Sequence, residues 1–148
     1  MSVEIKGLES LIKKVGTLGG VAQQGLYKGV GKAMTVIEGD AKDLCPVAEN
    51  MGGELRNSIH SKTRITNDGI EGVVGTNKEY AAYVEMGTGQ RGEASPSPPK
   101  APISGGYRED WTGMEAQPYL YPSLMQNKDT ANKLCAEELE KELSKLRG

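Results

Sequence analysis

The chain has 148 residues, of which 36% are hydrophobic and 5% aromatic, with 20 glycines and no phenylalanine. This length predicts a single domain, residues 1–148, and the low apolar content predicts a small core. A formal net charge of −2 argues against tight binding to DNA phosphates, and the lack of any long apolar run argues against a membrane span or a secretory signal. One histidine and two distant cysteines are too few for an ordinary zinc site.

The first two predicted elements are helices. Apolar residues spaced three and four apart predict an amphipathic helix over residues 8–18, and a second run over 21–44 has the same period. Gly25, Gly29 and Ala33 recur every four positions in the second run. Such small residues either let another backbone approach closely or simply weaken the helix. The proline that follows is expected to end it.

A β-hairpin is predicted next. Leu55–Ile65 alternates loosely and gains β-branched residues toward its end, and Ile70–Thr76 returns with a similar pattern. The intervening Thr66–Gly69 (Thr-Asn-Asp-Gly) contains residues that tolerate a positive φ, which is typical of a tight turn.

The second half of the chain alternates between helix and loop. A short helix over residues 79–86, with Tyr80 and Tyr83 on one side, is expected to end at a glycine cap. Residues 88–116 are rich in Pro and Gly and predict a long irregular loop, and a final helix opened by Pro118 runs to the C-terminus. This order predicts an α+β fold, with a small antiparallel sheet built around the hairpin and packed against N-terminal and C-terminal helices.

The cysteines offer one route to covalent catalysis. Cys45, with His60 as its basic partner, would suit a small cysteine hydrolase, since a cysteine nucleophile needs a neighbouring base. No glycine-rich elbow or oxyanion motif surrounds Cys45, which favours a structural thiol, and Cys135 lies on the apolar stripe of the last helix. We therefore predict a protein without catalytic, metal or cofactor-binding residues.

Glu85 is the most interesting acid, because it stands between two apolar residues just before a Gly-Thr-Gly turn. One interpretation is a solvated or capping carboxylate. The other is an ion pair with an arginine such as Arg56, which would fix the hairpin or a neighbouring subunit.

The 88–116 loop contains candidate binding residues. Its Gly-Thr-Gly-Gln-Arg-Gly start lacks the Gly-Lys-Ser/Thr ending of a phosphate-binding loop and does not follow a strand, which argues against nucleotide binding. Arg91, Tyr107 and Trp111 would suit a single-stranded nucleic-acid-binding module. Nearby acids dilute the positive charge, so a protein partner is the favoured interpretation.

Four motifs together resemble the head–tail joining family of tailed bacteriophages, also called neck or tail-completion proteins. They are Gly7-Leu8; Ala41-Lys42 with Cys45-Pro46-Val47, a glycine and Leu55–Ile59 (LRNSI); Tyr80–Thr88 (YAAYVEMGT); and Ala116–Ser123 (AQPYLYPS). The third motif is the most specific, and the set spans nearly the whole chain.

The chain departs from the family pattern in three places. Gly52-Gly53-Glu54 stands where the family usually has Thr-Gly, and Tyr119 stands where it usually has Phe. The loop from Thr88 to Ala116 is also longer than in many relatives.

The resemblance implies a non-enzymatic virion protein, made in the bacterial cytoplasm. It would form a homo-oligomeric ring, a hexamer or dodecamer, between the capsid connector and the tail tube. Its partners would be further copies, connector or neck proteins and tail-tube or tail-terminator proteins, with DNA passing through the lumen without specific binding, and no membrane.

Within such a ring we expect the hairpin and the 80–88 segment to form the subunit scaffold. The loop is expected to be free in the monomer and to order against a neighbour or the tail, while the terminal helix packs on the sheet. The expected contact residues are Arg56, Tyr80, Tyr83, Glu85, Arg91, Tyr107, Trp111 and Tyr119.

Overall fold

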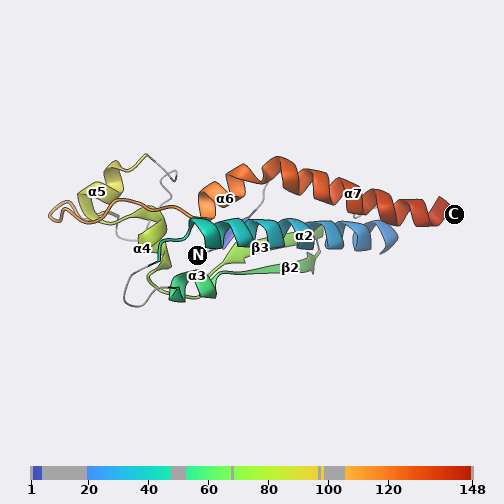
Figure 1. The fold of residues 1–148 in the computed structure, drawn as a ribbon, viewed down its shortest axis with the longest axis horizontal. Coiled ribbons are helices and arrows are strands. Elements are labelled where there is room, and N and C mark those ends of the chain that lie inside the picture. The colour runs from blue at the N-terminus through green and yellow to red at the C-terminus, as the bar shows by residue number, and fades with distance from the viewer. Residues whose placement is uncertain are drawn as a thin grey trace.

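The computed structural model describes residues 2–4, 20–47, 53–67, 69–96, 98 and 106–147, which form an elongated α+β molecule (Figure 1). The helix expected over residues 8–18 lies outside this described part. The elements in chain order are β1 (Ser2–Glu4), α2 (Gly20–Leu44), α3 (Glu54–Ser58), β2 (His60–Thr66), β3 (Gly69–Gly75), α4 (Ala81–Met86), α5 (Gly89–Ala94), α6 (Leu120–Gln126) and α7 (Lys128–Arg147).

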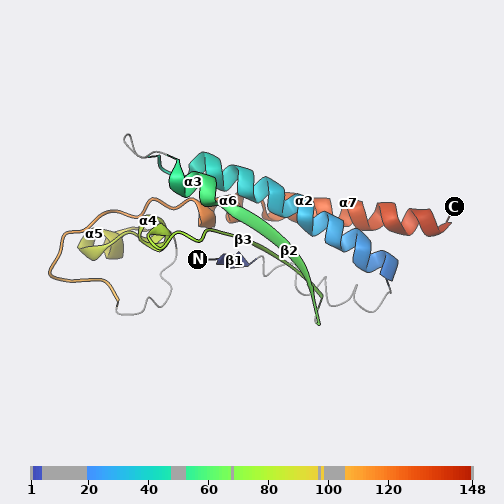
Figure 2. The same ribbon diagram turned by 90° about the horizontal axis from the view of Figure 1, so that it is seen from below.

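The sheet is antiparallel, with the strand order β1-β3-β2. In the hairpin, Ile65 pairs with Ile70 and Thr66 with Gly69, so the turn lies where the Thr-Asn-Asp-Gly sequence predicts it. Helix α2 covers one face of the sheet, as Figure 2 shows from a second direction. A Cβ on Gly72 of β3 would lie only 2.6 Å from Met34 Cγ of α2, so this glycine lets the helix sit directly on the strand.

Helices α2 and α7 run side by side along the length of the molecule (Figure 1). A Cβ on Gly29 would lie 2.6 Å from Cys135 Cα, and one on Gly25 would lie 3.0 Å from the Glu138 carbonyl oxygen. The small residues of α2 therefore do let another backbone approach closely. Two lysines of α2 continue this contact: Lys28 pairs with Glu142 at 2.8 Å, and Lys32 pairs with Glu138.

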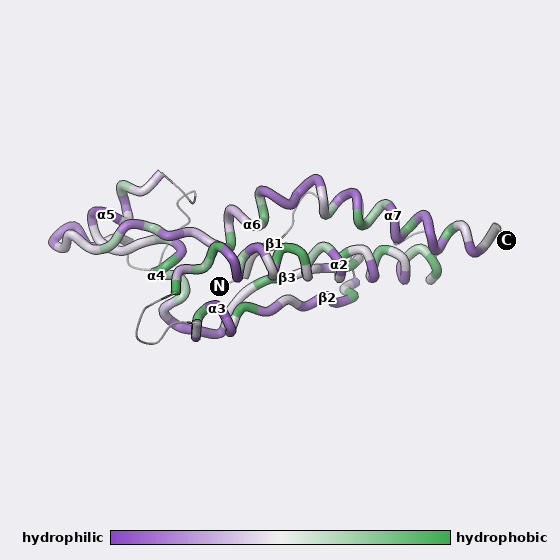
Figure 3. The backbone as a smooth tube through the Cα atoms, in the orientation of Figure 1, coloured by the Kyte–Doolittle hydropathy of each residue, from purple (hydrophilic) through white to green (hydrophobic). Residues whose placement is uncertain are grey.

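The core lies between α2 and its neighbours. Figure 3 shows more of the hydrophobic colour along α2 than along α7, as expected for a helix placed between a sheet and a second helix. The buried apolar residues of α2 follow the predicted period: Ala22, Leu26, Val30, Ala33, Met34, Ile37 and Ala41. The α+β fold and the central hairpin are thus confirmed.

Three details of the predicted elements were wrong. Residues 55–59 do not extend the first hairpin strand, because Glu54–Ser58 forms the short helix α3 and the strand begins at His60. The 88–116 segment is not wholly irregular, since it contains α5. The C-terminal helix is divided at Asn127, whose side-chain amide donates to Asp40 Oδ2 and to the Ser123 carbonyl oxygen, both at 2.7 Å.

The long C-terminal helix also differs from expectation in its position. Helix α7 packs along α2 rather than on the sheet, and the preceding α6 reaches β1. The reason lies in the sequence of α2, whose Gly25 and Gly29 face α7 while larger apolar residues such as Val30 and Met34 face the strands.

Candidate functional site

The loop end of the molecule, which we define as α4, α5 and residues 106–118, lies opposite the C-terminus of α7 (Figure 1). At its base, the side chain of Glu85 is completely buried. Its Oε2 accepts hydrogen bonds from the backbone N–H groups of Tyr119 and Leu120, at 2.8 and 3.0 Å, and its Oε1 accepts one from Tyr121 at 2.8 Å. Of the two interpretations of Glu85, the capping acid is the one observed, because this carboxylate satisfies the free N–H groups at the start of α6.

The expected ion pair between Glu85 and Arg56 is not made. Arg56 is exposed on α3, and its guanidinium lies 3.8 Å from Asp43 at the end of α2. The three backbone N–H groups around Glu85 already compensate its charge, so a buried arginine is not required.

Two tyrosines connect α4 to the segments that follow it. Tyr119 is fully buried, and its hydroxyl donates to the Ala81 carbonyl oxygen at 3.4 Å. Burial raises the pKa of Tyr119 well above its ordinary value, and the negative charge of Glu85 adds to this. Tyr107 donates its hydroxyl to the Met86 carbonyl oxygen at 3.0 Å, and burial raises its pKa as well.

The beginning and end of the 88–116 segment are held together backbone to backbone. Thr88 and Met114 form a β-bridge, in which the N–H of Thr88 donates to the Met114 carbonyl at 2.8 Å and the N–H of Met114 donates back at 3.0 Å. Gly113 makes this approach possible: its φ is +70°, and a Cβ there would lie 1.9 Å from the Thr88 carbonyl oxygen. We call this contact the glycine clasp, comprising Thr88, Gly113 and Met114.

The glycine clasp is a feature that the sequence reasoning missed. The Gly-Thr-Gly sequence at 87–89 indicates only a helix cap and a failed phosphate loop when it is taken alone. The signal that could have found the clasp is Gly113, the single glycine among the mostly large and charged side chains of residues 107–116.

Several expected contact residues are indeed exposed at the loop end. Tyr80, which precedes α4, and Tyr83 within it have 42% and 60% of their surface exposed, and Trp111 is 51% exposed. Arg91 is also exposed, on α5. The backbone of Trp111 is fixed nonetheless, since its carbonyl oxygen accepts a hydrogen bond from the N–H of Gln90 at 2.9 Å.

The eight predicted contact residues therefore fall into two groups. Glu85, Tyr107 and Tyr119 hold the loop end together from within. The exposed group is Arg56, Tyr80, Tyr83, Arg91 and Trp111.

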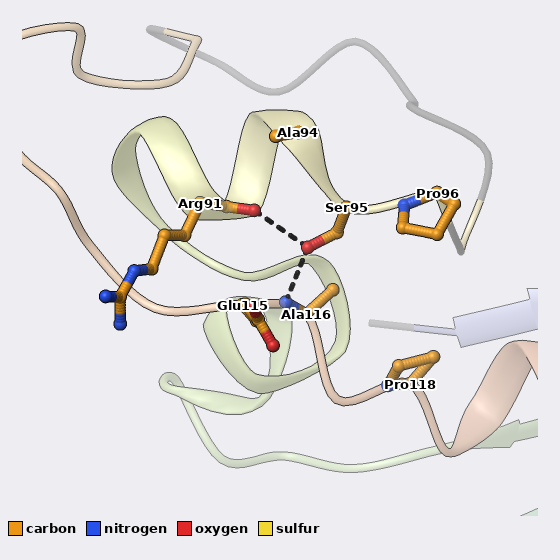
Figure 4. Close-up of a pocket in the computed structure, with 7 residues that line it drawn as sticks. All are labelled: Arg91, Ala94, Ser95, Pro96, Glu115, Ala116 and Pro118. Carbon is orange, nitrogen blue, oxygen red and sulfur yellow. Dashed lines mark hydrogen bonds between the residues drawn. The ribbon is translucent and has the colours of Figure 1, made fainter.

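An open pocket of about 410 Å³ lies between α5 and residues 115–118 (Figure 4). Alanine and proline side chains line it, with the charged side chains of Arg91 and Glu115. Ser95 closes one side, where its hydroxyl donates to the Arg91 carbonyl at 2.8 Å and accepts from the N–H of Ala116 at 3.0 Å. Through these two hydrogen bonds, the Ser95 hydroxyl links α5 to the segment that contains Ala116.

The cysteines are placed as structural residues. Cys45 is buried, and its burial raises the pKa of the thiol, an effect larger than the opposing one of the nearby Arg56. His60 is exposed on β2 and bonds through Nδ1 with the Ser58 carbonyl oxygen at 3.0 Å. Cys135 is completely buried against α2, and burial raises its pKa to about 11. A nucleophilic cysteine needs the opposite shift.

The described residues hold neither a metal-binding cluster nor a membrane-spanning helix. In the ranges that the structure describes, no three His, Cys, Asp or Glu side chains gather into a group that could hold a metal ion. No helix within those ranges has both the length and the apolar content needed to cross a bilayer.

Comparison with known proteins gives one match. The family described as "Bacteriophage HK97-gp10, putative tail-component" matches residues 9–87, which is more than half of the chain. The matched part contains α2, the hairpin and α4 with Glu85. No curated protein and no solved structure matches the chain. The chain therefore belongs to the HK97-gp10-like family of bacteriophage components.

Proposed function

We propose that this protein is a non-enzymatic virion subunit that forms a ring at the junction of head and tail. The ring would join the capsid connector to the tail tube and let DNA pass through its lumen. The observation that carries this proposal is the family match, whose description names a tail component. The four sequence motifs support the finer position at the head–tail junction.

The architecture of the loop end supports a role in contacts between proteins. Exposed Tyr and Trp side chains are frequent anchors of protein interfaces, because they supply a large contact area at little entropic cost. Here Tyr80 and Tyr83 lie at α4, which the hydrogen bonds of Glu85 join to the start of α6. Trp111 lies beside the glycine clasp. A fixed backbone beneath exposed aromatic rings reduces the entropy that binding would cost.

Deletion of the gene from the phage or prophage genome tests this function. We expect lysates with DNA-filled heads and separate, complete tails, seen by electron microscopy, and restoration of joined particles when the gene is supplied in trans. Joined, infectious particles in the absence of the protein would contradict the proposal, as would tails that fail to form at all.

A catalytic role is tested with the same complementation. Cys45→Ser and His60→Ala should each restore joined particles as well as the wild-type gene does, because neither residue takes part in chemistry. A folded Cys45→Ser protein that fails to complement would favour the cysteine hydrolase instead.

A further inference from the structure

We propose that two unlike surfaces of this chain bind each other in successive copies, and this inference rests on the ring proposed above. The first surface is the aromatic ridge, defined as Glu79, Tyr80 and Tyr83. The second is the open sheet face, on the side of the sheet opposite α2, defined by Lys62 and Arg64 of β2. In the proposed contact, the aromatic ridge of one copy docks on the open sheet face of the next.

The aromatic ridge presents chemistry that attracts cations. Tyr80 and Tyr83 are one helical turn apart, so both rings lie on the same side of α4, and Glu79 precedes them. All three are exposed, and among the described residues Glu79 forms no ion pair. A carboxylate beside exposed aromatic rings favours a cationic partner, through charge attraction and through cation–π contact.

The charge around the aromatic ridge strengthens this preference. Glu93, Glu109 and Glu115 are exposed at the same end of the molecule, and none of them forms an ion pair with a described residue. Among the described residues near the ridge, Lys78 is paired with Glu54 at 3.7 Å and Arg108 with Asp110 at 2.8 Å, so Arg91 is the opposing charge that forms no ion pair with a described residue. Among the described charges of the loop end that form no ion pair, the negative ones therefore outnumber the positive one.

The open sheet face supplies the complementary charge. In the register of the hairpin, Lys62 lies opposite Val73 and Arg64 opposite Glu71, while Ile70 and Val74 point to the α2 side. Lys62 and Arg64 are exposed. Arg64 pairs with Glu71 at 2.6 Å, whereas Lys62 forms no ion pair with any described residue. Lys62 is thus the cation on this face that a second copy can engage.

The two surfaces are separate within one subunit. β2 extends along α2 and away from α4 (Figure 2), so the elements that carry the two surfaces lie at different places in one chain. Two unlike, complementary patches on one chain are what a head-to-tail contact requires, and such a contact closes into a ring when its rotation suits. A contact between identical patches would instead bring Glu79 toward Glu79, or Lys62 toward Lys62.

A charge-swap experiment tests the contact with the purified full-length chain. Glu79→Lys and Lys62→Glu should each weaken self-association about tenfold in sedimentation velocity, because each places like charges together. Tyr83→Ala should weaken it by a similar factor, since it removes an anchor without changing the charge. The matched controls are Glu140→Lys and Lys128→Glu, which reverse exposed charges on α7 and should behave as wild type.

Mixing the two reversed proteins is the decisive step. In the mixture, the aromatic ridge of E79K carries a positive charge and meets the open sheet face of K62E, which carries a negative one. The unchanged aromatic ridge of K62E likewise meets the unchanged open sheet face of E79K. An equimolar mixture, and the double variant in one chain, should therefore regain association to within about threefold of wild type. Circular dichroism checks that every variant is folded.

Three results would overturn the inference: reversals that match their α7 controls, a mixture that fails to regain association, or a wild-type chain that stays monomeric at every concentration. The proposed function fails by a different result, which is absence of the protein from the head–tail junction of virions. A ring at the junction that ignores both reversals would leave the function standing and reject this contact.

Discussion

Glu85 and Tyr119, separated by thirty-four positions in sequence, are joined by a 2.8 Å hydrogen bond from the Tyr119 backbone N–H to the buried Glu85 carboxylate. The same carboxylate also accepts hydrogen bonds from the backbone N–H groups of Leu120 and Tyr121. It thereby fixes the end of α4 against the start of α6, and the loop end is built around this connection.

We expect Glu85→Ala to destabilise the protein by roughly 2–4 kcal/mol, because three N–H groups, two of them fully buried, would lose a charged acceptor. Glu79→Ala, six positions earlier on the exposed side, should change the free energy of unfolding by no more than about 0.5 kcal/mol. Urea denaturation followed by circular dichroism compares the two. Equal changes in the free energy of unfolding for the two substitutions would show that the hydrogen bonds of Glu85 do not stabilise the fold.

We expect opposite effects from substituting two glycines of α2, because Gly29 lies in the contact with α7 and Gly39 does not. A Cβ at Gly29 meets Cys135 Cα at 2.6 Å, so Gly29→Ala should cost roughly 1–3 kcal/mol through overpacking. A Cβ at Gly39 meets nothing within 4 Å, so Gly39→Ala should stabilise the helix by up to about 1 kcal/mol. Thermal melts of both variants give the sign directly, and a stabilising Gly29→Ala would contradict the close approach.

The same contact is expected to weaken in acid. Hydrogen bonds from Lys32 and Lys28 hold the pKa values of Glu138 and Glu142, respectively, below the ordinary 4.5. A lowered folded-state pKa adds stability that is fully present above the unfolded-state value and is lost as the pH falls through the folded-state value. The free energy of unfolding should therefore fall as the pH drops below 4.5.

Denaturation in urea at neutral pH and in acid measures this dependence. The double variant Glu138→Gln/Glu142→Gln should show a shallower fall than wild type, whereas Glu140→Gln, exposed on the same helix, should keep the wild-type slope. If the double variant kept that slope too, the acid sensitivity would have to arise elsewhere.

The glycine clasp can be followed by fluorescence, because the chain has a single tryptophan and Trp111 lies beside the clasp. Gly113→Ala places a Cβ 1.9 Å from the Thr88 carbonyl oxygen at a positive φ and should release the segment. Gly106→Ala shares the positive φ, of +64°, but meets nothing within 4 Å, so it carries only the backbone strain of about 1 kcal/mol.

We expect Gly113→Ala to lower the fluorescence anisotropy of Trp111 and to speed proteolysis of the segment, and Gly106→Ala to stay close to wild type in both. Indistinguishable anisotropy in the two variants would mean that the clasp does not hold Trp111 in place.

Local patterns predicted what local physics determines. The period of α2, the Thr-Asn-Asp-Gly turn and the glycine after Met86 each act within a few residues, and each was found where expected. Residues 55–59 were misassigned because a loose alternation over five residues fits a helical turn as well as a strand. Helix α5, with its Gly-Gln-Arg-Gly start, has no apolar period to detect.

The site depended more on tertiary contacts. Tyr80, Tyr83 and Trp111 were predicted from the sequence as contact residues, and each is exposed. The burial of Glu85 could not be predicted, because its partners are backbone N–H groups far along the chain, and no side-chain pattern marks them. The choice between a cap and an ion pair with Arg56 was decided only by packing.

A cryo-electron-microscopy reconstruction of the head–tail junction of virions carrying this protein tests the proposed ring most directly. We expect a closed ring of identical copies between connector and tail tube, with an open lumen and with each loop end in contact with another protein. Density for the chain only elsewhere in the virion, or its absence from the particle, would contradict the proposed ring.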